Sequence, residues 1–188
     1  MANLNRVAML LLAVLLSQCG VNRPVVLNAG NTASPPPVQQ PQGNGPSTQP
    51  VFLEGEFRDT NGNVIQLEDF KSKPTVLIFA SEFCEVCLRE TRSIVEKLDN
   101  KRPTGVNIIT VLVGLDQPQW AEDWATDHQV PWLVGIDSPN LALKNKYCGA
   151  SPVPCNVVQT PEDGIVLQKV GEAHIEELEK LTGPWETL

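Results

Sequence analysis

The sequence predicts an α/β domain over residues 51–188, with a central mixed sheet flanked by helices and an N-terminal β-hairpin extension. Apolar residues run almost without interruption through 75–80 and 106–113, which is typical of strands buried on both faces. Each run is followed by a segment with the periodicity of an amphipathic helix. The Thr-Pro-Glu-Asp-Gly turn at 160–164 separates two more apolar segments and indicates a closing antiparallel hairpin.

The individual elements follow from these patterns in chain order. Residues 57–65 are expected to form the opening hairpin, in which an Asn-Gly turn joins two strands. Pro103 and Gly105 end the helix that follows the first buried strand. The residues that share one side of this helix are Leu88, Thr91, Ile94, Val95 and Leu98. The other elements are expected as a helical turn at 67–70, a helix at 117–129, a strand at 132–136, a helical turn at 141–146, strands at 156–159 and 165–170, and a helix at 175–181.

Two tryptophans mark the expected buried side of the helix at 117–129. Trp120 and Trp124 are four residues apart, which is about one helical turn, so their indoles lie on the same side. We expect that side to be the core face.

The charge balance argues against nucleic acid as a partner. The chain has a formal net charge of −8, whereas a protein that binds the phosphate backbone needs Lys and Arg to neutralise phosphates. An acidic surface also repels anionic lipid headgroups. Attachment to a membrane would therefore need a dedicated anchor.

The N-terminal segment indicates export and such an anchor. Residues 1–18 combine a basic residue with an apolar run at 7–16, which is too short to span a bilayer but suits a signal peptide. The run ends in Leu-Ser-Gln-Cys and resembles a bacterial lipobox with Cys19 as the lipidated residue, although Gln18 replaces the usual small residue. Gly20 would favour the outer membrane in a Gram-negative host. The alternative is ordinary signal cleavage that leaves Cys19 as a free thiol.

Residues 19–50 are expected to tether the domain to this anchor. The stretch 29–50 is rich in Pro, Gln, Asn, Gly and Ser and contains no charged residue. Such a composition cannot bury enough apolar area to offset the entropy of ordering the chain, so this part is expected to be disordered. We therefore expect an exported bacterial lipoprotein, anchored in the lipid bilayer and facing the periplasm or the cell exterior.

The central chemical motif is Cys84-Glu-Val-Cys87, which follows a buried strand and opens an amphipathic helix. Helix N-terminal amides carry partial positive charge and stabilise the Cys84 thiolate, the form that attacks disulfides. Cys87 lies one turn further on, where it can attack the mixed disulfide and release the reduced substrate. A bare C-x-x-C would also fit half of a zinc site, but the strand-to-helix context favours a redox pair.

A second feature is Val153-Pro154, just before the expected strand at 156–159. An X-Pro bond in this setting is a candidate cis peptide. A cis-proline beside the redox pair would leave neighbouring backbone groups free to pair with a substrate chain. The alternative is a trans turn proline, since Pro152 lies close by.

The segment 57–90 resembles the thioredoxin superfamily, in particular its membrane-tethered TlpA/ResA-type branch. The matching residues are Asp59, Gly62, Leu67, Asp69, Phe70, Lys73, Pro74, Phe79, Ala80, Cys84, Cys87 and Glu90. The order of elements matches over about 51–182. The resemblance implies a thioredoxin-like fold and thiol–disulfide exchange on exported protein substrates that carry disulfides. It also implies a membrane electron-donor protein, and neither a bound organic cofactor nor a metal.

The same resemblance implies roles for residues around the pair. Cys84-Glu-Val-Cys87 with Glu90 is similar to the CEPC-x-x-E pattern of cytochrome-c-maturation reductases, so Glu90 is expected to handle protons. The alternative is a solvated first-turn carboxylate. Pro154 completes the expected catalytic set. The expected substrate contacts are Phe83, Glu85, Val86 and Val153.

The chain departs from the family pattern in ways that bear on the direction of electron flow. Phe83 replaces the usual Trp, and Glu82, Glu85 and Glu90 put negative charge near Cys84. Like charge opposes thiolate formation. We therefore expect Cys84 to be less acidic than in a strong oxidase, its disulfide to be hard to reduce, and the protein to act as a reductant.

Cys148 and Cys155 are unusual for this family and bracket the loop that contains Pro154. Their separation permits a disulfide that would brace this loop. Two other interpretations stay open. The pair could exchange electrons with Cys84 and Cys87, or all four thiolates could bind zinc or copper.

Two other activities fit parts of the pattern. A copper metallochaperone of the same fold would use two cysteines and a distant histidine. His128 and His174 are, however, expected at the surface, and the cysteine spacing is shorter than in that group. A peroxide-reducing enzyme of the peroxiredoxin type would need a Thr-x-x-Cys motif, which the sequence lacks.

Overall fold

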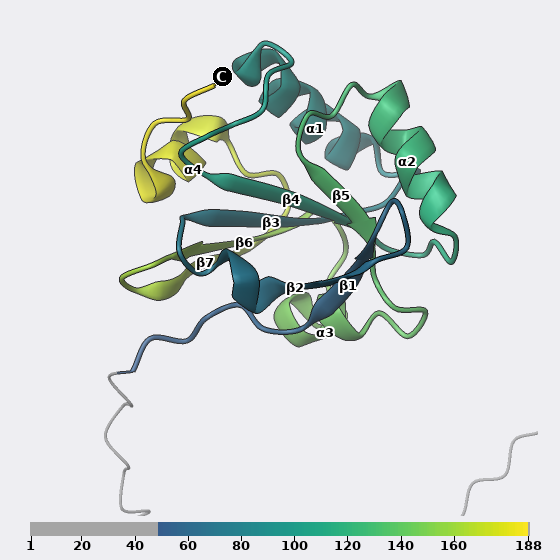
Figure 1. The fold of residues 1–188 in the computed structure, drawn as a ribbon, viewed down its shortest axis with the longest axis horizontal. Helices are drawn as coiled ribbons and strands as arrows, with labels where there is room; N and C mark the ends of the chain where they lie inside the picture. The colour runs from purple at the N-terminus through teal and green to yellow at the C-terminus, as the bar shows by residue number, and fades with distance from the viewer. Residues whose placement is uncertain (1–48, 188) are drawn as a thin grey trace, which may run out of the picture. The chain divides into compact units, whose positions relative to one another are not determined.

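The computed structural model describes residues 49–187 (Figure 1), so the expected signal peptide, Cys19 and most of the tether lie outside the described residues. The strands in this range are β1 (Glu56–Asp59), β2 (Val64–Gln66), β3 (Thr75–Ala80), β4 (Asn107–Leu112), β5 (Leu133–Ile136), β6 (Cys155–Thr160) and β7 (Gly164–Val170). The helices are η1 (Leu67–Phe70), α1 (Glu85–Leu98), α2 (Pro118–Asp127), α3 (Ala142–Cys148) and α4 (Ile175–Thr182). No helix among these is long and apolar enough to cross a membrane.

Within the described range, seven strands form one sheet in the order β2-β1-β5-β4-β3-β6-β7. β3, β4 and β5 are parallel, as expected for strands joined by helical crossovers. β1 runs antiparallel to β5, and β6 runs antiparallel to β3. The predicted mixed sheet flanked by helices is therefore confirmed, and the opening hairpin extends it at one edge.

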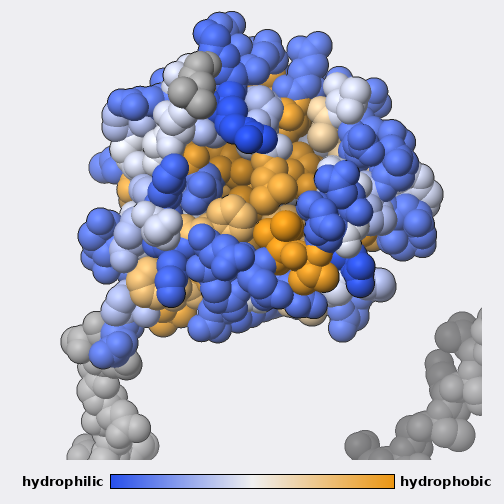
Figure 2. Space-filling model, viewed as in Figure 1, coloured by the Kyte–Doolittle hydropathy of each residue, from blue (hydrophilic) through white to orange (hydrophobic). Residues whose placement is uncertain are grey.

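The central strand β3 contributes to two cores, one on each face of the sheet. All six of its residues are buried, as its continuous apolar run predicted. Val76, Ile78 and Ala80 belong to the cluster that includes buried residues of α1, α2 and α4, whereas Leu77 and Phe79 belong to the cluster with α3. Successive side chains of a strand point to opposite faces, which explains the alternation. In the view of Figure 2, hydrophilic side chains cover most of the surface and apolar ones gather near its centre.

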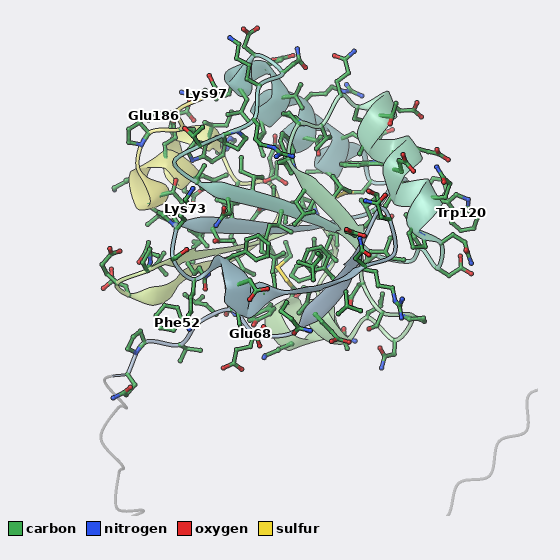
Figure 3. The ribbon with its side chains drawn as sticks, viewed as in Figure 1. Phe52, Glu68, Lys73, Lys97, Trp120 and Glu186 are labelled. Atoms are coloured by element: carbon green, nitrogen blue, oxygen red, sulfur yellow. A yellow bond between two sulfur atoms is a disulfide. The ribbon has the colours of Figure 1, made fainter. Side chains whose placement is uncertain are left out.

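The expectation for α2 was wrong for one of its two tryptophans. Trp124 is buried, but Trp120 is 49% exposed and points away from the domain (Figure 3). Ala121 and Trp124 are the buried residues of this helix, and Ala125 is partly buried against the same core. Trp120 lies in the first turn of α2, at the edge of the side that packs on the core, so its ring extends beyond the residues that cover this side.

The hairpin extension depends on a close backbone approach at Gly135. β1 pairs with β5 in antiparallel orientation through Arg58 with Ile136 and Asp59 with Gly135. A Cβ at Gly135 would overlap the carbonyl oxygen of Arg58 and the ring of Phe57. Glycine is therefore required here for β1 to join the sheet.

Candidate active site

Cys84 and Cys87 form a disulfide at the start of α1, with their Cα atoms 5.2 Å apart. β3 ends at Ala80, and a short loop leads to Cys84, which is the N-cap residue of α1 with extended backbone angles (φ −92°, ψ 100°). Cys84 is partly exposed, whereas Cys87 is 1% exposed. The pair thus combines an accessible sulfur with a sequestered one, as an attacking and a resolving cysteine require.

The surroundings of the Cys84 sulfur act on its ionisation in opposite directions. Cys84 Sγ accepts the backbone N–H of Cys87 at 3.2 Å, which favours the thiolate. The same sulfur lies 3.6 Å from the carbonyl oxygen of Val153. In the reduced protein a Cys84 S–H could donate to this oxygen, so the carbonyl favours the neutral thiol.

The loop that carries Val153 and Pro154 lies against the redox pair. The Val153–Pro154 peptide bond is cis, and Pro154 is buried. The carbonyl oxygen of Pro154 accepts the N–H of Gly171 at 2.8 Å, which ties the loop to the chain after β7. Val153 packs against both core clusters and directs its carbonyl oxygen at Cys84.

Cys148 and Cys155 form a second disulfide, with Cα atoms 6.4 Å apart. It joins the last residue of α3 to the first residue of β6 and encloses the loop that contains Pro154. The two cysteines are 8% and 1% exposed. The four cysteines of the described range are thus paired in two disulfides, and the interpretation as one four-thiolate metal site was wrong.

Glu90 is buried, so the alternative of a solvated carboxylate was wrong. Its side chain is 2% exposed, and its Oε1 accepts the N–H of Ala173 at 2.7 Å and the side-chain amide of Asn156 at 2.9 Å. Burial raises the pKa of Glu90 to about 7, although both hydrogen bonds oppose the rise. At neutral pH Glu90 therefore supplies less negative charge to the site than the sequence suggested.

The other residues expected to contact substrate lie around the entrance to the pair. Phe83 is 86% exposed, Glu85 is exposed, and Val86 is partly buried. A groove of about 370 Å³ runs between Phe83 and α2. Its remaining lining residues are Glu82, Trp120, Asp123, Trp124, Asp127 and His128. An exposed aromatic ring beside a reactive sulfur is suited to contact an unfolded or extended polypeptide.

Asn156 is a site residue that the sequence reasoning missed. It is fully buried in β6, and its amide donates to Glu90 Oε1 and, at 3.1 Å, to the carbonyl oxygen of Gly171. The available signal was a polar side chain between the apolar residues Cys155 and Val157 of a buried strand, two residues after Pro154. A buried amide needs hydrogen-bond partners, and here one partner is the acidic group one turn beyond Cys87.

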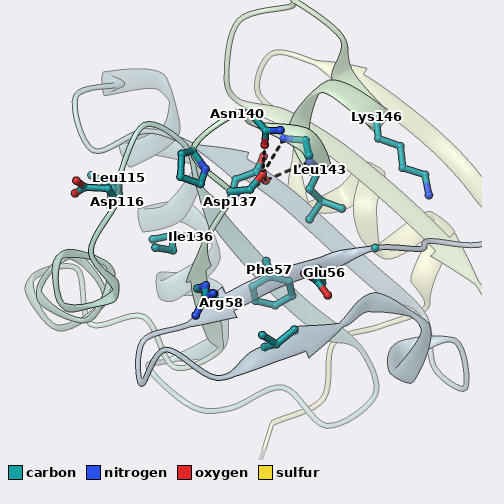
Figure 4. A pocket seen from close by; sticks show the side chains of 15 residues that line it. Glu56, Phe57, Arg58, Leu115, Asp116, Ile136, Asp137, Asn140, Leu143 and Lys146 are labelled. Atoms are coloured by element: carbon teal, nitrogen blue, oxygen red, sulfur yellow. Dashed lines mark hydrogen bonds between the residues drawn. The ribbon is translucent and has the colours of Figure 1, made fainter.

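A larger cavity, of about 560 Å³, lies between β1, the residues after β5 and α3 (Figure 4). None of the residues predicted for the redox site lines it. The Asp137 carboxylate at its wall accepts the backbone N–H groups of Ser138, Leu143 and Lys144 at 2.7, 3.2 and 2.8 Å. Asp137 therefore satisfies backbone N–H groups at the start of α3, which gives this carboxylate a structural role.

The histidines do not form a metal site with the redox pair. Among residues 49–187, no group of three or more His, Cys, Asp or Glu side chains is placed to hold an ion. His128 is the C-cap residue of α2, and its ring lies edge-on to Trp124 with centroids 5.1 Å apart. His174 is the N-cap residue of α4 and is exposed. Nothing in this part of the chain favours the copper alternative.

The sequence identifies the class of protein to which this fold and site belong. Residues 50–165 match the AhpC/TSA family, and the chain belongs to that family. The chain is 30% identical to the thiol–disulfide oxidoreductase ResA of Bacillus subtilis (strain 168) over 144 residues, which cover 75% of this chain and 77% of ResA. ResA of Bacillus thuringiensis subsp. konkukian (strain 97-27) is 29% identical over 124 residues, which cover 65% of this chain and 69% of that ResA.

Solved structures show the same fold. StoA from Bacillus subtilis superimposes with a TM-score of 0.54 at 20% identity, covering 70% of this chain and 98% of StoA. The thioredoxin domain of a thiol–disulfide oxidoreductase from Bacteroides vulgatus gives a TM-score of 0.55 at 22% identity, covering 71% of this chain and 94% of that domain. The chain thus has a thioredoxin-like fold and is a thiol–disulfide oxidoreductase of the ResA type, with Cys84 and Cys87 as its dithiol–disulfide pair.

Proposed function

We propose that this oxidoreductase acts as a reductant of disulfides in exported proteins, while a lipid on Cys19 holds it at a membrane. The observation that carries the proposed direction is the environment of Cys84 Sγ. It lies 3.6 Å from the Val153 carbonyl oxygen, and the carboxylates of Glu82 and Glu85 flank it in sequence. These groups disfavour a thiolate, and a strong oxidant needs a stabilised reduced form. The disulfide is therefore the favoured state, and the dithiol gives up electrons readily.

The proposed cycle begins with the reduced pair. The Cys84 thiolate attacks one sulfur of a substrate disulfide, forms a mixed disulfide and releases the first substrate thiolate, which takes up a proton. Cys87 then passes its proton to the Glu90 carboxylate and attacks Cys84 Sγ. The second substrate sulfur leaves as a thiolate and is protonated by solvent. A membrane donor then returns two electrons, which restore the dithiol.

Glu90 suits the proton-transfer step because its pKa lies near neutral pH. A base works best when its pKa is close to the working pH, and burial has brought Glu90 to about 7. Cys87 is itself buried, so water has poor access to its proton. The side chain three residues further along the same helix is a suitable acceptor.

Substrate contact in this proposal occurs over the exposed side of the pair. The Phe83 ring offers apolar surface next to Cys84, and the groove beside it adds two tryptophans together with three carboxylates. The loop at Val153 offers backbone groups. An extended segment of an unfolded protein has the complementary chemistry, with an apolar side chain near its cysteine.

A redox titration tests the direction of electron flow. Purified protein is equilibrated with glutathione buffers, and the fraction of Cys84–Cys87 disulfide is measured by thiol alkylation. We expect a potential more reducing than the glutathione pool, which lies at about −220 to −260 mV by extraction. In Glu85→Gln, the loss of a negative charge shifts the potential upward, whereas the matched exchange Glu96→Gln on the exposed side of α1 leaves it unchanged. A potential near that of the oxidase DsbA, about −120 mV, would refute the proposed direction.

Two variants test the roles of the cysteines and of the anchor. Cys87→Ser is expected to accumulate a mixed disulfide with exported substrates that carry a disulfide, while Cys84→Ser accumulates none. Cys19→Ser is expected to move the protein from the membrane fraction to the soluble fraction without altering its potential. A soluble wild-type protein would contradict the lipid anchor and leave the redox assignment intact.

A further inference from the structure

Two buried polar atoms close to the redox pair lack hydrogen-bond partners, and they belong to neighbouring side chains. They are Glu90 Oε2 and Asn156 Oδ1. The other polar atoms of the two head groups are bonded, because Asn156 Nδ2 donates to Glu90 Oε1 at 2.9 Å and the N–H of Ala173 donates to the same oxygen at 2.7 Å. The two orphaned atoms therefore belong to head groups that are already in contact through a hydrogen bond.

Hydrogen-bond chemistry defines what would satisfy both atoms. A carboxylate oxygen and an amide oxygen are both acceptors, so Glu90 Oε2 and Asn156 Oδ1 cannot bond to each other as they stand. A single proton on Oε2 turns that atom into a donor. A carboxylic acid and a primary amide then match, because each offers one donor and one acceptor to the other.

We infer that Glu90 and Asn156 form an acid–amide pair that holds one proton between Glu90 Oε2 and Asn156 Oδ1. Asn156 is then the positioning residue for proton handling at Glu90. Its N–H favours the carboxylate through Oε1, and its carbonyl oxygen favours the acid through Oε2. The pair can therefore hold Glu90 in either protonation state without moving the backbone of α1 or β6.

The charged groups near Glu90 do not neutralise its carboxylate, so Asn156 is the residue that positions its proton. Burial is the largest cause that raises the pKa of Glu90, Glu172 raises it further, and Lys169 on β7 lowers it. Both of these charges are engaged elsewhere, since Arg89 of α1 pairs with Glu172 at 2.7 Å and Lys169 pairs with Glu177. Among the described residues no cation forms an ion pair with Glu90, so a proton is the charge that remains to neutralise it.

This inference rests on the proposed reductase cycle for its catalytic meaning. When Cys87 loses its proton to Glu90, Oε2 becomes an O–H that donates to Asn156 Oδ1, and both orphaned atoms gain a bond in the same step. Glu90 is thus a better proton acceptor than an isolated buried carboxylate. When the membrane donor reduces the disulfide, Glu90 returns the proton to the Cys87 thiolate, so the pair ends each cycle unchanged.

Nuclear magnetic resonance of the oxidised full-length protein tests the pairing directly. In this form the paired cysteines carry no thiol that titrates. With ¹³C-labelled Glu, Gln and Asn side chains, Glu90 Cδ is expected to titrate with a midpoint near pH 7. Asn156 Cγ is expected to follow with the same midpoint, because its oxygen gains a hydrogen bond on acidification. In Glu90→Gln, whose amide donates at every pH, Asn156 Cγ is expected to stay at its low-pH position.

Gln159 supplies the matched control. It lies on the same strand, is equally buried, and has an amide nitrogen without a partner. Its side-chain signals are expected to stay constant through the titration. Gln159→Leu is expected to leave the Glu90 midpoint unchanged, whereas Asn156→Leu moves it by about one pH unit or more. If Asn156→Leu fails to fold, the wild-type and Glu90→Gln spectra still decide the matter.

An Asn156 Cγ signal that stays still while Glu90 titrates would overturn the inference, as would an Asn156 titration that persists in Glu90→Gln. The measurement uses no substrate and no reduced thiol. A failed reductase assay would therefore leave a positive spectrum standing, and a negative spectrum would leave the proposed reductase activity untouched.

Discussion

Replacing Glu90 by Gln removes a proton that the folded protein holds and the unfolded chain releases. Glu90 is 2% exposed, and burial raises its pKa from 4.5 to about 7. Below about pH 4.5 both states are protonated, and the stabilising contribution is complete. Between about pH 4.5 and pH 7, Glu90 keeps its proton in the folded protein but loses it in the unfolded chain. The unfolding free energy therefore falls as pH rises through this window.

The size of this loss follows from the gap between the two pKa values. Each pH unit of difference corresponds to about 1.4 kcal/mol, so moving from pH 5 to pH 8 costs the folded protein about 2 to 3 kcal/mol. Carboxylates whose pKa is lowered on folding, such as Asp59, Glu172 and Glu179, act at lower pH. Their contributions are present above their unfolded pKa and change little across this range. The pH dependence between 5 and 8 therefore reports mainly on Glu90.

The measurement is urea unfolding of the oxidised protein at pH 5 and pH 8, followed by tryptophan fluorescence. The wild type is expected to lose about 2 to 3 kcal/mol on going to pH 8, and Glu90→Gln much less. Glu96→Gln makes the same chemical exchange on the exposed side of α1 and is expected to match the wild type. If the wild type and Glu90→Gln lose stability in parallel, the assignment of Glu90 as a buried group that is neutral below pH 7 is wrong.

Three further predictions concern other parts of the structure. The double variant Cys148→Ser/Cys155→Ser removes a disulfide between residues that are seven positions apart. It is expected to lower the unfolding free energy by about 2 kcal/mol. Unchanged urea unfolding would contradict a bracing role for this disulfide. Phe83→Ala removes a ring that is 86% exposed, so the melting temperature is expected to stay constant. The KM for a disulfide-bearing protein is expected to rise several-fold. An unchanged KM would show that Phe83 does not contact the substrate. Gly135→Ala places a methyl group against β1 and is expected to lower the unfolding free energy by about 1 to 3 kcal/mol. Gly105→Ala is the control that we expect to be tolerated, because the nearest atom to its new Cβ lies at 3.7 Å. Equal melting temperatures for the two variants would show that β1 moves away from the methyl group freely.

The parts of this protein that were predictable depend on residues close together in the chain. The apolar run of β3 predicted a strand buried on both faces, and all its residues are buried. The step from that strand into an amphipathic helix predicted where Cys84 would lie, because the strand, the loop and the first helical turn are consecutive. Spacing alone also placed Cys87 one turn further along the same helix.

The parts that were not predictable depend on contacts between distant segments. Helical periodicity showed that Trp120 and Trp124 share a side of α2, but not that the covering surface stops before Trp120. Glu90 looked equally suited to solvent or to a proton-handling site. Its burial is set by Asn156 and Ala173, which lie 66 and 83 residues further along the chain. The sheet brings these groups together through the pairing of β3 with β6, and a side chain acquires its pKa from such neighbours and from the loss of water around it.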